Sequence, residues 1–199
     1  MKSSKASQFF AAAVVTVSAT IVSAQSTSWN IDAAHSQAAF TVRHMGISNV
    51  NGRFGNVGGT ISIDEKDFTK SSVNATIDTT TVDTGVAQRD GHLKSPDFFD
   101  SAKYPAMTFV SKYIARTSDG YAITGDLTIH GVTKSVVLRV DAPEKEQLGP
   151  DNKQHRGFNA TTTIHRQDFG LVWNGTLRSG DAMVGDDAKI TLDIEAVKG

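Results

Sequence analysis

Along most of this chain, hydrophobic and polar residues alternate one by one, which is typical of β-strands with one buried face. Residues 188–196 are the clearest case: alanine, isoleucine and leucine fill the even positions, and lysine, threonine, aspartate and glutamate fill the odd ones. The same alternation runs through residues 37–44, 57–64, 73–78, 121–129, 136–140 and 158–164. Amphipathic strands of this kind predict an antiparallel sheet with one face toward the core and one toward water.

Turn-forming residues separate these segments. They are Asn51-Gly52, Ser118-Asp119-Gly120, His130-Gly131, Gly149-Pro150-Asp151-Asn152 and Gly185-Asp186-Asp187. These turns divide the chain into eight or nine predicted strands, depending on whether residues 29–32 form a strand separate from residues 37–45. The fold class is therefore all-β, as either an antiparallel barrel or a sandwich.

An insert near residues 84–101 breaks the alternation. Thr84 is expected to cap a short helix that runs to about Leu93, and Ser95 with Pro96 is expected to start another turn. The insert concentrates charged and aromatic side chains, which are found more often at functional loops than in a scaffold strand.

The first 24 residues predict a secretory signal peptide. Lys2 and Lys5 form a positively charged N-terminal region, and residues 9–22 are an uncharged stretch rich in alanine and valine. Small residues then allow cleavage near Ala24. The apolar stretch is shorter than the roughly 20 residues that span a bilayer, so no stable membrane span is expected. We therefore expect residues 25–199 to form one exported domain, in the periplasm of a bacterium.

Composition narrows the partners. Without the leader, which carries two lysines and no acidic residue, the formal net charge falls from −1 to −3. A mildly acidic chain without a basic cluster argues against a nucleic acid partner. No cysteine occurs, so an exported fold would be held by its core alone.

The residues that alternation predicts to face inward have both large and small side chains. Phe40, Tyr121, Leu138 and Phe158 are large, whereas Gly59 and several alanines are small. Small inward residues favour an eight-stranded barrel with a ligand cavity. They also occur where two sheets interdigitate in a solid sandwich core, so both architectures remain open at this point.

Several motifs in a fixed order make the chain resemble the YceI-like family of periplasmic polyisoprenoid-binding proteins. They are Trp29-Asn30-Ile31-Asp32, His35-Ser36, Phe40-Thr41-Val42-Arg43-His44, Gly52-Arg53-Phe54, Arg89-Asp90-Gly91-His92-Leu93, Phe98-Phe99-Asp100, Tyr104-Pro105, Gly125-Asp126-Leu127-Thr128-Ile129-His130-Gly131-Val132-Thr133-Lys134, Arg166-Gln167-Asp168-Phe169-Gly170 and Val184-Gly185-Asp186. The resemblance covers nearly the whole exported part of the chain.

This resemblance implies an antiparallel, eight-stranded, extended lipocalin-like barrel with a short helical insert near residues 84–101. The ligand would be an isoprenoid lipid, a quinone precursor or a fatty amide, held for transport, storage or sequestration, and family relatives are linked to stress responses. Combined with strand parity, it predicts a cavity lined by Phe40, Val42, His44, Phe54, Ile61, Leu93, Phe98, Phe99, Phe109, Ile123, Leu127, Leu138, Phe158, Ile164 and Phe169. A homodimer is compatible with the chain, but no sequence feature requires one.

Four residues are candidates for contact with a polar head group: Arg89, Asp90, His92 and Arg166. A structural alternative stands beside this hypothesis. An Arg89–Asp90 pair could fix the short helix over one end of the barrel, with Leu93, Phe98 and Phe99 as its apolar underside. His44 likewise could be a hydrogen-bonded core histidine.

Enzyme functions have less support. The chain has no cysteine nucleophile, no G-x-S-x-G elbow and no phosphate-binding glycine loop. A hydrolase or isomerase acting on an amphiphile is the alternative, with His44, His92 and Asp90 as acid–base candidates. The histidines lack metal-ligand spacing, so neither a metal nor another cofactor is predicted, although a site of His35, His44 and His92 across strands is conceivable.

Overall fold

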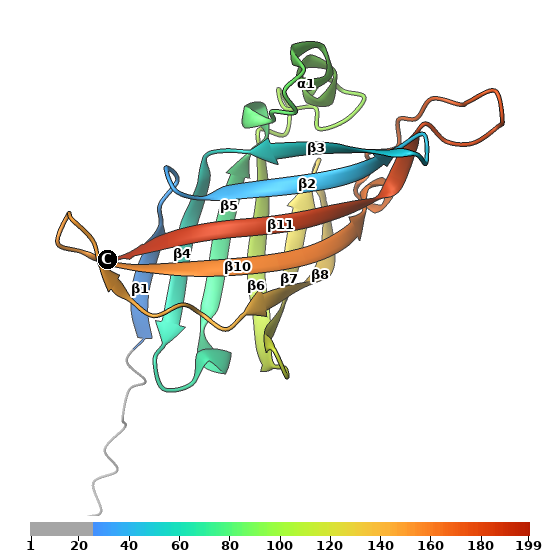
Figure 1. The fold of residues 1–199 in the computed structure, drawn as a ribbon. Helices are drawn as coiled ribbons and strands as arrows, with labels where there is room; N and C mark the ends of the chain where they lie inside the picture. The colour runs from blue at the N-terminus through green and yellow to red at the C-terminus, as the bar shows by residue number, and fades with distance from the viewer. Residues whose placement is uncertain (1–25) are drawn as a thin grey trace, which may run out of the picture.

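A computed structural model of the protein describes residues 26–199 (Figure 1). The expected signal peptide lies outside the described residues. The strands are β1 (Ser26–Ile31), β2 (Gln37–His44), β3 (Ser48–Phe54), β4 (Val57–Asp64), β5 (Ser72–Asp78), β6 (Ala106–Arg116), β7 (Gly120–Ile129), β8 (Val132–Asp141), β9 (Gln147–Leu148), β10 (Gln154–His165) and β11 (Val184–Lys198). One α-helix, α1 (Ala87–Lys94), and three short 3₁₀ helices, η1 (Phe68–Lys70), η2 (Thr79–Thr81) and η3 (Arg166–Phe169), complete it.

Eight strands close into an antiparallel ring. Their order is β11, β1, β4, β5, β6, β7, β8 and β10, and β10 pairs back onto β11. The β2–β3 hairpin lies outside this ring and pairs with β11, whereas the two-residue β9 pairs with β10. The prediction of an eight-stranded barrel is thus confirmed, and the sandwich alternative is wrong.

The last strand, β11, closes the ring. One edge of β11 pairs with β10 from Asp187 to Val197. The other edge pairs first with β2, between Val184 and Asp193, and then with β1, between Ala196 and Lys198. The two early strands therefore lie end to end along one partner, and the turn between them separates residues 29–32 from residues 37–45.

Burial follows the predicted parity. Along β11, Ala188 and Ala196 are buried, while Lys189, Thr191 and Asp193 are exposed. The same agreement holds along β7, β8 and β10, where the predicted inward residues are buried or half-buried. Alternation predicts burial well here because each strand has one face toward the barrel interior.

Three local predictions are wrong. Gly185-Asp186-Asp187 does not form a turn but lies within β11, at the irregularity in its pairing with β2 between Val184 and Ala188. Asn51-Gly52 does not form a turn but lies within β3; the chain reverses at residues 45–47, where Met45 and Gly46 have φ values of 53° and 71°. Gly52 is required by packing, because a Cβ atom there would lie 2.3 Å from Cζ of Phe40. Thr84 does not cap α1 either, since Val86 flanks the helix and no side chain caps it.

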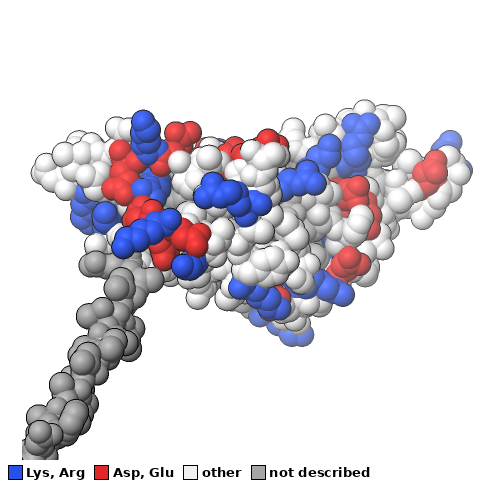
Figure 2. All heavy atoms as spheres, turned by 90° about the horizontal axis from the view of Figure 1, so that it is seen from below, with Lys and Arg blue, Asp and Glu red and all other residues white. Residues whose placement is uncertain are grey.

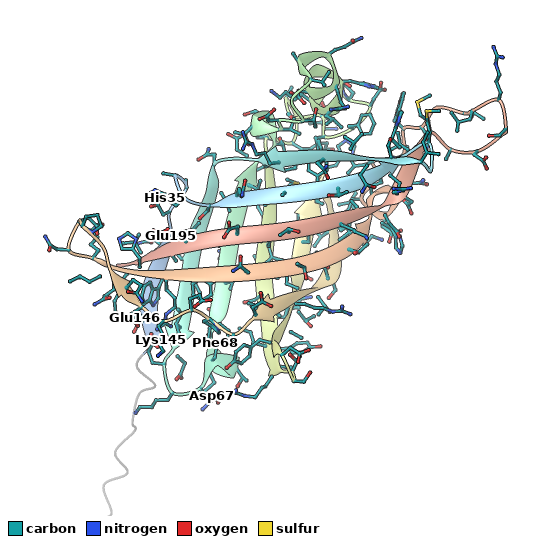
Figure 3. All side chains as sticks on the ribbon, in the orientation of Figure 1. His35, Asp67, Phe68, Lys145, Glu146 and Glu195 are labelled. Atoms are coloured by element: carbon teal, nitrogen blue, oxygen red, sulfur yellow. The ribbon has the colours of Figure 1, made fainter. Side chains whose placement is uncertain are left out.

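Aromatic and charged side chains close the end of the barrel away from α1. Trp29 is fully buried, and the guanidinium carbon of Arg156 lies 5.0 Å from the centroid of its indole ring. Arg156 also forms ion pairs with Glu146 at 2.6 Å and Glu65 at 3.3 Å. Phe68 belongs to η1 and packs against the cluster that contains Trp29. Figure 3 labels both Phe68 and Glu146 in this part of the barrel.

The outer surface carries both signs of charge. On the face shown in Figure 2, lysine and arginine side chains are interspersed with aspartate and glutamate. No helix within residues 26–199 is long and apolar enough to cross a bilayer.

A glycine pair in β4 provides a test of the ring's packing. Gly59 has a φ of +131°, and a Cβ atom there would lie 2.1 Å from the carbonyl oxygen of Asn74, whereas a Cβ on neighbouring Gly58 would meet nothing within 4 Å. We expect Gly59→Ala to lower the unfolding free energy by at least about 1–3 kcal/mol, the cost of a strained backbone conformation. Gly58→Ala is the matched control and should be nearly neutral. Equal urea midpoints for the two variants would contradict this interpretation.

Candidate functional site

The barrel encloses a cavity of about 420 Å³. Side chains from every strand of the ring contribute to its wall, together with side chains from β2, β3, α1 and the segment between η3 and β11. Most of these side chains are aliphatic or aromatic. The inward parity of the strands therefore forms a continuous apolar surface around the cavity.

Almost all of the predicted lining residues lie on this wall; the exception is Phe169. Phe169 is instead only 2% exposed and packs into a hydrophobic cluster that includes Ile129 and Leu171. Strand parity predicted that Phe169 faces the cavity, but β10 ends at His165 and Phe169 belongs to η3, where the alternation of a strand no longer applies. That the remaining residues contact a ligand stays a prediction.

Polar residues are few on the wall. They are Arg43, His44, Arg89, His92, Thr108, Thr162 and Arg166. The five basic residues come from the last residues of β2, from α1 and from η3, whereas the two threonines lie within strands. No carboxylate is among the described lining residues, so the fixed charges facing the cavity are positive at neutral pH.

Arg166 is a structural anchor rather than an open head-group contact. Its side chain is buried and donates hydrogen bonds to the backbone carbonyls of Leu171, Trp173 (2.9 Å), Val184 (3.3 Å) and Gly185 (2.9 Å). Burial lowers the pKa of the Arg166 guanidinium, and the nearby carboxylate of Asp186 partly opposes this effect. These four bonds hold the segment before β11 against the end of the barrel.

Arg89 and Asp90 each bind Thr84, and the ion pairs among residues 26–199 include none between Arg89 and Asp90. The predicted Arg89–Asp90 pair is therefore wrong, and the two side chains hold the start of the insert through Thr84 instead. The backbone nitrogen and Oγ1 of Thr84 donate to Oδ1 of Asp90 at 2.8 and 2.5 Å. Nε of Arg89 donates to Oγ1 of Thr84 at 2.8 Å, and Nη2 donates to its carbonyl oxygen at 3.0 Å. Arg89 still contributes to the cavity wall, but Asp90 does not.

His92 lies in an aromatic cluster at the same end of the barrel. Its ring centroid is 5.0 Å from that of Phe98 and 4.7 Å from that of Trp173, both edge to face. Its Nε2 atom is 2.8 Å from Oδ2 of Asp97. The contact with Asp97 orients the imidazole, whose ring packs against Phe98 and Trp173.

His44 differs from the other basic wall residues. It lines the cavity, and none of the hydrogen bonds among residues 26–199 involves its imidazole. No hydrogen bond joins any two of His44, His92 and Asp90, which are the acid–base candidates of the enzyme hypothesis. A metal site of His35, His44 and His92 is wrong, because β2 lies between His35 and His44 and extends about 23 Å from Gln37 to His44 at about 3.3 Å per residue.

Sequence reasoning missed several wall residues at this end, among them Arg43, Trp173 and Met183. Arg43 has outward parity, but it donates to Oδ1 of Asn49 at 3.0 Å and to the carbonyl of Gly46 at 2.6 Å, which folds it across the hairpin end. Trp173 and Met183 lie in the irregular segment between η3 and β11, whose sequence does not alternate and therefore does not predict which side chains face inward.

Comparisons with known proteins give a consistent result. The model of the YceI-like domain matches residues 29–196. UPF0312 protein VPA0850 of Vibrio parahaemolyticus is 37% identical over 196 residues, covering 95% of this chain and 97% of the relative. The crystal structure of the Campylobacter jejuni YCEI protein matches with a TM-score of 0.65 and 32% identity, over 79% of this chain and 90% of that one. A polyisoprenoid binding domain from Saccharophagus degradans has a TM-score of 0.63 at 16% identity, over 87% of this chain and 99% of that one, a likeness that shows the fold.

The role of Arg166 can be tested by Arg166→Lys. A single ammonium cannot reach four carbonyls, so we expect the unfolding free energy to fall by about 2–4 kcal/mol, because buried acceptors lose their donors. Limited proteolysis should also cut faster within residues 171–183. Arg178→Lys, on the exposed part of the same segment, is the control and should leave both measurements unchanged. If the two variants unfold at the same urea concentration, Arg166 is not the anchor of this segment.

Proposed function

Because the chain belongs to the YceI-like domain family, we propose that it binds an isoprenoid or a similar amphiphilic lipid inside its barrel. The observation that carries the proposal is the cavity wall. It is apolar along the barrel and carries its basic residues at the α1 end alone. The polyisoprenoid binding of the Saccharophagus degradans domain, which shares the fold, adds support.

The apolar wall suits a hydrocarbon tail. A volume of about 420 Å³ falls within the range of small-molecule sites, which is roughly 300–1,000 Å³. Each buried methylene contributes about 0.8 kcal/mol, so a tail gains affinity from length without any polar contact. The strands β10 and β11 are about 40–50 Å long at roughly 3.4 Å per residue, and a tilt of about 35–45° leaves the barrel about 30–40 Å long for an extended chain. Length and shape would then determine which tails bind.

The basic end suits a neutral or anionic head group. Arg43, His44, Arg89 and His92 all face this end of the cavity, and no described carboxylate opposes them there. Hydrogen bonds from charged donors are stronger than those between neutral groups, so an oxygen-bearing head group would be favoured over an ammonium. A quinone precursor, a fatty amide and an isoprenoid phosphate all meet this requirement.

We place this activity in the periplasm, as the expected signal peptide indicates. A long isoprenoid is nearly insoluble in water, so a carrier is needed wherever it leaves a membrane. Enclosure in a barrel would serve transport, storage or sequestration. No acid–base constellation at the site favours the enzyme alternative.

Blocking the cavity tests the proposal directly. Ala160 faces the cavity from β10, and its neighbour Thr161 is exposed on the outer face. Lipid extracted from natively purified wild-type protein should contain one amphiphile per chain by mass spectrometry. Ala160→Phe should lose this lipid, because the ring fills the space of the tail, whereas Thr161→Phe should retain it. Circular dichroism would verify that both variants fold, and equal lipid content in both would refute enclosure in the barrel.

Matched ligands test the head-group assignment. We expect geranylgeranyl phosphate to bind roughly tenfold more tightly than geranylgeranylamine, a difference of about 1.4 kcal/mol. Titration calorimetry at two salt concentrations would measure it, and the difference should shrink as salt screens the charges. Tighter binding of the amine would contradict a basic cavity end.

A further inference from the structure

Two imidazoles and three carboxylates gather on the outer face of the barrel, where β10 begins and β11 ends. They belong to Asp32, His35, Asp151, His155 and Glu195. None of them lines the cavity. Figure 3 labels His35 and Glu195 at this end of the molecule. The cluster is therefore independent of the proposed lipid site.

The ligand atoms of three of these residues already converge. Nδ1 of His35 lies 2.8 Å from Oδ2 of Asp32. One such atom from each of Asp32, His35 and Glu195 lies within 4.8 Å of the other two. In a tetrahedral site with bonds of about 2.0–2.1 Å, ligand atoms are roughly 3.4 Å apart, so shifts of about 1 Å in these side chains would close the cage.

Backbone hydrogen bonds hold the three ligand residues in this arrangement. The backbone nitrogen of Asp32 donates to the carbonyl oxygen of Glu195 at 2.8 Å. The buried hydroxyl of Ser36 donates to the same carbonyl at 3.2 Å and accepts from the backbone nitrogen of Glu195 at 3.0 Å. Oδ1 of Asp32 accepts from the nitrogen of Ala34 at 2.9 Å, which leaves Oδ2 toward His35. The corner between β1 and β2 is thus fixed to β11.

His155 supplies support behind Glu195. Its Nδ1 atom is 2.7 Å from Oε1 of Glu195, and its Nε2 atom is 2.9 Å from Oδ1 of Asp151. An imidazole that joins a ligand carboxylate to a second carboxylate is the kind of outer contact that orients metal ligands. His155 comes from β10, whereas Glu195 lies in β11 and Asp32 and His35 lie in the corner between β1 and β2.

We propose that Asp32, His35 and Glu195 form a binding site for a divalent transition metal ion, with His155 as a positioning residue. One imidazole nitrogen with two carboxylate oxygens suits zinc and its neighbours. Calcium would require more oxygen ligands than this corner offers. The ion would join the corner between β1 and β2 to the end of β11, where the ring of strands closes.

The same two strands provide a control cluster at their other end. Nδ1 of His165 lies 2.8 Å from Asp187 and 3.5 Å from Asp186, with all three side chains exposed. This group also combines an imidazole with two carboxylates, but it has neither a second imidazole nor a buried hydroxyl among its described hydrogen bonds. It reports how much metal an ordinary exposed histidine on this surface binds.

The test uses full-length exported protein without a histidine tag, stripped with EDTA and titrated with zinc chloride by calorimetry. We expect one ion per chain with micromolar affinity, visible absorption on addition of cobalt(II), and a higher melting temperature with zinc. Glu195→Gln and His35→Ala should each abolish stoichiometric binding. His155→Ala should weaken it by roughly 10–100-fold, the usual cost of losing an outer partner. His165→Ala should bind as the wild type does.

Glu195→Gln keeps the proposal falsifiable, since its backbone bonds to Ser36 and Asp32 are unchanged and its amide oxygen can still accept from His155. Unfolding curves without metal would verify that each variant folds. Binding that persists in Glu195→Gln and His35→Ala, or that is lost in His165→Ala, would overturn the assignment. So would a wild type that binds zinc no better than millimolar, because the cluster would then be only a hydrogen-bonded surface network.

Discussion

The structure depends on the ladder that β11 makes along both of its edges. One edge pairs with β10, while the other pairs with β2 and then with β1, so a single strand closes the ring and carries the hairpin outside it. Within the ring, closure leaves no terminal strand whose free edge could attract other chains, whereas β3 of the hairpin and β9 are terminal strands of the sheet. It also fixes the parity of every strand, because a shift of one residue would turn the whole apolar set outward. The cavity exists only while this register holds.

Charged side chains pack at both ends of the barrel, where they have different tasks, and the wall between them carries only the hydroxyls of Thr108 and Thr162. At the closed end, Trp29 and Arg156 are packed together, and Glu65 and Glu146 neutralise the guanidinium. At the α1 end, basic side chains are held by backbone carbonyls and hydroxyls, as Arg166 and Arg89 are. The interior between them can stay apolar because its strands satisfy their polar groups within the ladder. The molecule therefore has a direction, from a sealed end to a basic end.

The choice of a barrel over a sandwich came from the family resemblance, whereas alternation was enough to predict the strands and which of their faces is buried. It failed where tertiary contacts decide the outcome. Gly52 looks like a turn residue but makes room for Phe40. Trp173 lies in a segment without a period. The Asp32–His35 spacing is local, but Glu195 joins it through strand pairing across the whole chain, which no spacing rule detects.

The cavity has a consequence for how the fold is maintained. Side chains that line a cavity of about 420 Å³ have fewer packing partners than the side chains of a solid core, and stability falls as cavity volume grows. Under the proposed function, a bound hydrocarbon chain would supply part of those contacts and would act as a removable part of the core. The folded population would then rise with the concentration of amphiphile in the surroundings. Thermal stability would thus measure how much lipid the protein holds.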